Sequence, residues 1–114
     1  MTREGAIQEI TNRITEFYRP ERVYLFDSVA RGDATPDSDL DFCVVLPDDA
    51  PEELMRSHEI HKRLRDLDGL DYSRDIIPWR KADFDGCAAY VVVSLPAIII
   101  REGRLLYDDR RAIA

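Results

Sequence analysis

The stretch from Leu25 to Val45 reads LFDSVARGDATPDSDLDFCVV, and it decides the fold of this chain. Val23 to Phe26 is a short run of strand-forming residues, and Leu40 to Leu46 is a second such run. Residues 32–38 lie between them and are rich in glycine, aspartate, threonine, proline and serine, a composition typical of turns. We therefore expect two strands joined by a loop.

Two acids, Asp39 and Asp41, stand at the start of the second run. Residues i and i+2 of a strand point to the same face, so both carboxylates are expected to project together, away from Leu40 and Phe42. Adjacent carboxylates repel each other unless a cation is bound. Hard oxygen ligands suit Mg²⁺, and two such ions can clamp a phosphoryl-type transfer. The alternative is a pair of acids on a solvent-exposed strand, which is a common pattern.

Ser28 follows the first strand and is expected to begin a short helix over residues 28–31, where backbone N–H groups form an anion site. The run FDSVARGDATPDSDLDF resembles the nucleotidyltransferase signature of the DNA polymerase β superfamily: an apolar residue, Gly-Ser, a spacer and an Asp-x-Asp strand. Its tail, ARGDATPDSDLD, is similar to the minimal nucleotidyltransferases of the MNT type. These are small domains often encoded beside a HEPN-domain protein.

The resemblance implies a site for ATP or another NTP and one or two Mg²⁺ ions. Ser28 would bind the triphosphate, with Asp27, Arg31 and Ser38 as further nucleotide-binding residues. Arg31 would either steady the phosphates or brace the loop, since arginine often ties loops to backbone carbonyls. Asp39 and Asp41 would hold the Mg²⁺ ion.

The resemblance also implies a third catalytic and metal-binding carboxylate beside Asp39 and Asp41. Asp75 is the best candidate, because an acid inside the apolar run of residues 72–79 is costly unless it is paired or binds a metal. Asp71 is the second candidate. A plain ion pair of Asp75 with one of the flanking arginines, Arg74 or Arg80, remains the alternative.

Position 27 departs from the family pattern, because Asp27 stands where the signature has glycine. Glycine allows close approach of the backbone to phosphates. A carboxylate ~4 Å from a phosphate charge would cost about 4 kcal/mol at an intermediate dielectric, or roughly three orders of magnitude in affinity. Two alternatives avoid this cost: Asp27 turns away from the phosphates, or it helps to coordinate a metal ion.

The resemblance therefore implies one of two functions. The first is Mg²⁺-dependent transfer of a nucleoside monophosphate, AMP from ATP, to a hydroxyl acceptor such as a tyrosine of a HEPN toxin, as in an MNT-type antitoxin. The second is a catalytically impaired nucleotidyltransferase fold that acts as a protein-binding antitoxin, because Asp27 replaces the motif glycine.

Composition narrows the class of protein. The net charge of −7 does not favour free binding to a nucleic-acid backbone, which needs a basic surface.

Cys43 and Cys87 belong to no CxxC pair, and Cys43 is expected to be a buried free thiol. His58 and His61 lack an evident third ligand and are expected to be ordinary surface or boundary residues. No signal peptide or membrane span is evident, so a cytoplasmic location is the expectation.

The whole chain, 1–114, is expected to form one mixed α/β or α+β domain, with a short mixed sheet and helices mainly on one face. Tyr90 to Val93 is apolar and is either core or an exposed partner surface. Ser94 is expected to cap the helix that follows it, and Gly103 to end that helix. The other expected elements are helices at 7–17, 51–68, 81–87 and 95–101 and strands at 72–79 and 105–107.

Overall fold

The computed structural model describes residues 2–26, 32, 39–56, 58–65 and 74–112. The four strands follow one another in the order that the sequence predicts, and the short helix expected at residues 28–31 lies outside the described residues. In chain order they are α1 (Arg3–Tyr18), β1 (Arg22–Phe26), β2 (Leu40–Leu46), α3 (Glu52–Arg56), α4 (Glu59–Arg63), β3 (Arg74–Arg80), α5 (Lys81–Tyr90), α6 (Leu95–Glu102), β4 (Arg104–Asp108) and α7 (Asp109–Ala112).

The four strands form one mixed sheet in the order β3-β2-β1-β4. β1 pairs antiparallel with β2 and with β4, whereas β2 pairs parallel with β3. A parallel pair needs a long crossover connection, and the segment that contains α3 and α4 provides it. The expected mixed α+β architecture is confirmed, and β4, which contains the strand predicted at 105–107, lies at an edge of the sheet.

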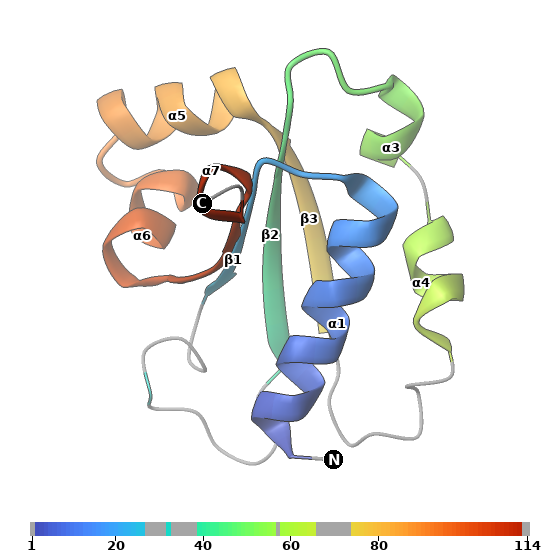
Figure 1. Cartoon of the computed structure of the whole chain (residues 1–114). Coiled ribbons are helices and arrows are strands. Elements are labelled where there is room, and N and C mark those ends of the chain that lie inside the picture. Colours follow the sequence, from blue (N-terminus) through green and yellow to red (C-terminus); the bar gives the residue numbers. More distant parts are fainter. Residues whose placement is uncertain (1, 27–31, 33–38, 57, 66–73, 113–114) are drawn as a thin grey trace.

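Each face of the sheet carries its own hydrophobic cluster, and Figure 1 shows α1 and α4 on one side of the sheet and α5 and α6 on the other. The larger cluster lies under α1 and α4 and takes the alternate β2 residues that begin with Leu40 and Phe42. The smaller cluster lies under α5 and α6 and takes Cys43, Val45 and Phe84. The period-2 alternation of a strand explains how β2 serves both clusters.

Helix α1 is held at both ends by local hydrogen bonds. The Thr2 hydroxyl accepts a hydrogen bond from the Gly5 N–H at 3.0 Å, which caps the amino end. At the carboxyl end Arg19 adopts a left-handed conformation, with φ 49° and ψ 57°, and donates its N–H to the Thr15 carbonyl at 3.0 Å. Pro20 then prevents the helix from continuing.

Asp48, in the loop after β2, and Glu52, at the start of α3, both make long-range hydrogen bonds. Asp48 accepts a hydrogen bond from the Ala82 N–H at 2.8 Å, so it caps α5 from a distant loop. Arg80 donates to the carbonyls of Asp48 and Ala50 at 2.9 and 3.0 Å, and it pairs with Glu52 at 2.8 Å. This hydrogen bond lowers the pKa of Glu52 below its ordinary value. One arginine thus ties the end of β3 to the segment that follows β2.

The prediction of one continuous helix from Pro51 to Asp68 is wrong, because α3 and α4 are separate helices. His58 leaves the helical conformation at φ −96° and ψ 7°. A helix turns about 100° per residue, so Leu54 in one straight helix would lie roughly 120° away from Ile60 around the axis. The break lets Leu54 pack against the larger cluster while Ile60 and Leu64 are buried in it.

Helices α5 and α6 form a bent pair. Ser94 caps α6 as expected, because its hydroxyl accepts from the Ala97 N–H at 3.2 Å, and Gly103 ends that helix. A side chain at Gly103 would meet the Ile99 carbonyl oxygen at 2.5 Å, so close packing requires glycine there. Within the described residues, no helix taken singly is long and apolar enough to cross a bilayer; only the α5–α6 pair, bent by 80°, reaches that length and composition.

We predict that Arg19→Gly stabilises the protein. A non-glycine residue in the left-handed region costs roughly 1 kcal/mol, and glycine removes that cost at the price of some extra freedom in the unfolded chain. The expected gain is up to about 1 kcal/mol, measured by urea unfolding. Arg19→Ala is the matched control, because it removes the same side chain but keeps the strain. Equal stability of the two variants would contradict the prediction.

We also predict that Cys43 is inert to thiol reagents until the protein unfolds. Cys43 is fully buried, and burial raises its pKa to about 12, an effect that the nearby Arg22 charge only partly opposes. At pH 8 roughly one thiol in ten thousand would be ionised, and the thiolate is the reactive form. In a Cys87→Ser variant, reaction with a disulfide reagent should follow the unfolding rate. Rapid reaction of the folded variant would refute this.

Candidate functional site

Asp41 and Asp75 are direct partners in the parallel pairing of β2 with β3. Neighbouring strands lie about 4.8 Å apart, and register partners project from the same face of a sheet. That face is the one covered further along by α5 and α6, since Cys43 follows Asp41 at the i+2 position and belongs to the smaller cluster. Asp41 is partly buried and Asp75 is exposed. The register therefore brings two carboxylates from separate strands side by side.

Asp39 lies one residue before β2 and is exposed. Leu40 and Phe42 are fully buried in the larger cluster, so the predicted alternation along this segment is confirmed for them. Because β2 begins at Leu40, strand alternation fixes the face on which Asp41 lies, whereas Asp39 lies just before the first residue of the strand. Asp39 and Asp41 thus belong to the same end of the sheet.

The carboxyl end of β1 lies beside these acids, because Phe26 is the register partner of Asp41. Phe26 and Asp39 are the two ends to which the segment 27–38 is attached. The predicted nucleotide-binding residues of that segment, Asp27, Ser28, Arg31 and Ser38, lie outside the described residues. The same holds for Asp71, the second candidate for the third carboxylate.

The arginines that flank Asp75 in sequence are engaged elsewhere. Arg74 donates to the Leu64 carbonyl at 3.0 Å, and Arg80 pairs with Glu52. Strand alternation also directs Arg74 and Arg80 away from the face that carries Asp75. In the part of the chain that the structure describes, no ion pair includes Asp75.

The donor chemistry of the two paired strands fits Mg²⁺. This ion is usually held by one or two carboxylates together with substrate phosphates and water, and the register supplies two adjacent carboxylates. Across the described ranges, no group of three or more His, Cys, Asp or Glu side chains converges as a complete protein-only metal site. His58 and His61 are exposed, with ring centroids 6.2 Å apart. The fit therefore rests on Asp41 and Asp75, with Asp39 nearby in the chain.

Ile77 is a neighbour of this site that the sequence analysis did not single out. It follows Asp75 by two residues on the same face of β3 and is 37% exposed. The sequence predicts one apolar strand over residues 72–79 with an acid inside it. The period-2 alternation of that strand is the signal that places Ile77 beside Asp75.

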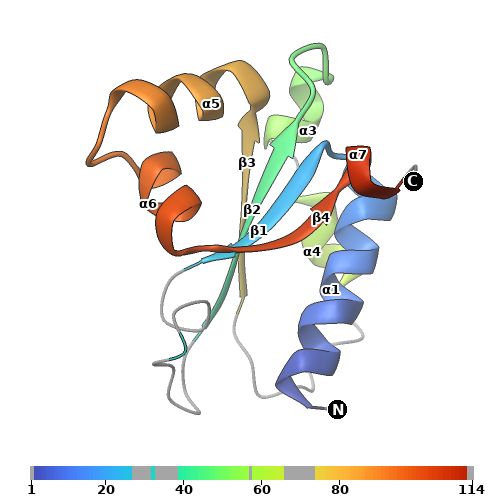
Figure 2. The ribbon, with the colours of Figure 1, turned by 60° about the vertical axis from the view of Figure 1, so that its left-hand side comes forward.

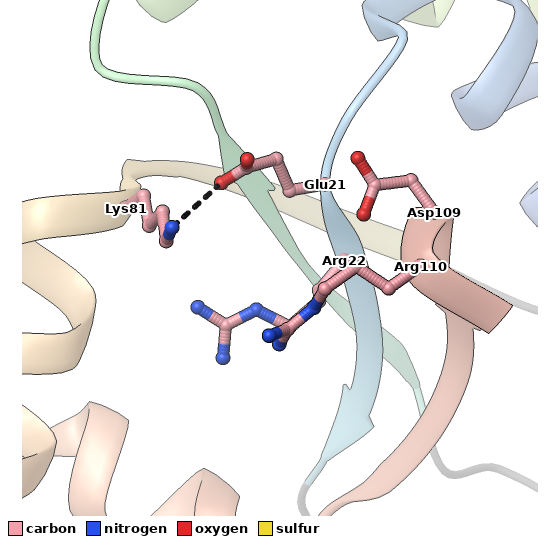
Figure 3. A pocket seen from close by; sticks show the side chains of 5 residues that line it. All are labelled: Glu21, Arg22, Lys81, Asp109 and Arg110. Carbon is pink, nitrogen blue, oxygen red and sulfur yellow. Dashed lines mark ion pairs between the residues drawn. The ribbon is translucent and has the colours of Figure 1, made fainter.

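A small hollow lies at the other end of β1, and Figure 3 shows the charged side chains that line it. Lys81 pairs with Glu21 at 3.8 Å across it, and Arg22 is bonded to Asp85 at 2.7 Å. Its volume is about 40 Å³, close to what one water needs and too small for a triphosphate. Its cations therefore stabilise the fold at this end of the strand, away from Asp41.

Comparisons with known proteins agree with the geometry. The family model described as nucleotidyltransferase domain matches residues 7–106. No curated protein matches the chain. A protein from Sulfolobus solfataricus proposed to be a nucleotidyltransferase is similar in structure, with 19% identity, a TM-score of 0.59 and coverage of 92% of this chain and 79% of that one.

Two further solved structures are similar at the level of the fold. One is a toxin–antitoxin solved with AMP-PNP, at 20% identity and a TM-score of 0.57, covering 92% of this chain and 76% of that one. The other is a mutant of the toxin–antitoxin MntA–HpeT, at 18% identity and a TM-score of 0.55, with the same coverages of 92% and 76%. The match over residues 7–106 settles the family: this chain belongs to the nucleotidyltransferase domain family.

Proposed function

We propose that this chain transfers a nucleoside monophosphate, AMP from ATP, to a hydroxyl acceptor in a Mg²⁺-dependent reaction. The acceptor in this proposal is a tyrosine of a HEPN-type toxin, so that the chain acts as an MNT-type antitoxin in the cytoplasm. The observation that carries the proposal is the register of Asp41 with Asp75 in a chain of this family. The similarity to a toxin–antitoxin solved with AMP-PNP supports the class of nucleotide and of partner.

The reaction needs one displacement at phosphorus. The acceptor oxygen forms a bond to the α-phosphorus, the bond from that phosphorus to the bridging oxygen breaks, and pyrophosphate leaves. The acceptor proton passes to the carboxylate of Asp75, which acts as general base and later releases the proton to water. Asp75 suits this role because it is exposed on an edge strand, where an acceptor on another molecule can approach it. No covalent enzyme intermediate is required.

The protein residues that would hold Mg²⁺ are Asp39, Asp41 and Asp75. When bound, the ion supplies charge neutralisation for the triphosphate and for the adjacent carboxylates. The segment from Asp27 to Ser38 would bind the nucleotide phosphates through Ser28 and Arg31. Catalysis in such a site consists mainly of positioning and electrostatic stabilisation.

A second candidate function is supported by Asp27, which replaces the motif glycine. In this alternative the chain keeps the fold, does not bind NTP productively and acts by binding the toxin. The two candidates differ in one measurable property, the affinity for Mg²⁺–ATP. They do not differ in fold or in the ability to bind a partner.

We predict that Asp75→Asn lowers the rate of AMP transfer from labelled ATP to a purified HEPN-type partner by about 10²- to 10⁴-fold, because it removes the general base. Its Mg²⁺–ATP affinity, measured by calorimetric titration, should fall as well, because Asp75 would also hold the ion. Asp41→Asn should lower both quantities. Asp49→Asn is the control, since it also neutralises an exposed acid but lies in the loop after β2. Wild-type transfer by Asp75→Asn would exclude it as the base.

We predict that the wild-type chain binds Mg²⁺–ATP and that Asp39→Ala and Asp41→Ala weaken this binding in calorimetric titrations. Asp27→Gly should leave the affinity unchanged if Asp27 turns away from the phosphates, and lower it if Asp27 coordinates a metal ion. Absence of binding by the wild type, with binding restored by Asp27→Gly, would overturn the enzyme proposal and support the second candidate. Binding that requires Asp39 and Asp41 would exclude the second candidate.

A further inference from the structure

The turn between α5 and α6, together with α6, exposes several large apolar side chains to solvent. Tyr90, Val91, Val92 and Val93 are 87%, 46%, 72% and 83% exposed, and Ile100 on α6 is 51% exposed. We call these five residues the apolar turn. Figure 2 shows the α5–α6 connection projecting from the side of the sheet opposite α1. The sequence alone does not decide whether this segment is core or an exposed partner surface. In the structure it is exposed.

The backbone of the apolar turn is held in one conformation by hydrogen bonds. Arg101 donates to the Val92 carbonyl at 3.1 Å, and the Ser94 N–H donates to the Val91 carbonyl at 3.0 Å. The Ser94 hydroxyl also donates to the Cys87 carbonyl at 3.1 Å. A turn held in this way offers its side chains to a partner at a low cost in conformational entropy. Tyrosine at its edge is a residue type that often dominates binding energy.

Charge is absent from this part of the chain. Residues 86–100 contain no Asp, Glu, Lys or Arg, although charged residues make up 34% of the chain and about five would be expected in a stretch of that length. Interface cores are depleted in charge in the same way. The Arg101 guanidinium reaches the turn at the Val92 carbonyl, and the charges of the whole chain sum to −7.

We propose that the apolar turn is the docking surface for a protein partner that carries net positive charge and presents an apolar contact. The field of a chain with net charge −7 attracts a basic protein and accelerates its encounter, whereas it repels a second copy and an anionic lipid surface. The uncharged turn then provides the contact that excludes water, while the acidic remainder of the surface faces the basic rim of the partner.

The apolar turn lies on the same side of the sheet as Asp41 and Asp75, because α5 and α6 cover the face that these acids share. A partner seated on it would approach the face that carries the carboxylates. This inference rests on the proposed function only for the role of the partner as acceptor. The docking surface itself needs no catalysis, so the two proposals fail separately.

The test places a photo-crosslinking amino acid at position 92 of the full chain, expressed in its own cells, and identifies the cross-linked protein by mass spectrometry. That protein is then purified and titrated against wild type, Val92→Asp and Val92→Thr. Asn12→Asp is the matched control, because it adds the same charge on the exposed face of α1 and keeps an acceptor for the Gln8 hydrogen bond. Circular dichroism verifies that each variant is folded.

The proposal expects a basic cross-linked protein whose affinity falls at least tenfold with Val92→Asp, falls less with Val92→Thr, is unchanged with Asn12→Asp and weakens as salt is raised. Cross-linking of the chain to itself, binding to phosphatidylglycerol vesicles that Val92→Asp removes, an acidic partner, or no cross-linked protein would each overturn it. Docking without AMP transfer would leave this inference standing and refute the enzyme proposal. Transfer unaffected by Val92→Asp would refute this inference alone.

Discussion

The burial of β2 on both faces is the constraint on which the rest of the structure depends. Leu40 and Phe42 contribute to the larger cluster, while Cys43 and Val45 contribute to the smaller one. Asp41 is the one residue of this strand that is not fully inside. Because side chains alternate, a slip by one residue would drive Asp41 into the larger cluster and exchange the strand's apolar residues between the two clusters. The hydrophobic pattern therefore fixes where the carboxylate lies.

The parallel pairing of β2 with β3 places a second carboxylate, that of Asp75, beside Asp41. Asp41 faces Asp75 because the register is set by the apolar residues that follow both acids. Two carboxylates on neighbouring strands repel, and the repulsion is unfavourable for folding unless a cation or a proton offsets it. A cation bound at this end of the sheet with its phosphate ligands would offset that repulsion. Stabilising interactions such as the Arg80–Glu52 pair lie at the other end of β3.

Acidic charge and apolar exposure are divided between different parts of the surface. The apolar turn belongs to a stretch without charges, and its backbone is fixed by Arg101 and Ser94. Monomeric proteins rarely leave such a patch uncovered. The carboxylates and the turn lie on the same side of the sheet, because α5 and α6 cover the face that Asp41 and Asp75 share.

The sequence by itself determined the order of the four strands, the β2 boundaries from Leu40 to Leu46, the cap at Ser94, the buried thiol of Cys43 and the family. These features depend on residues close together in the chain, so local periodicity and capping chemistry reveal them. The break between α3 and α4 could not be found in this way, because the packing of Leu54 and Ile60 against the sheet decides it. Only the tertiary structure decided that Asp41 faces Asp75 and that Tyr90 to Val93 is surface, since strand register and burial arise from contacts between distant segments.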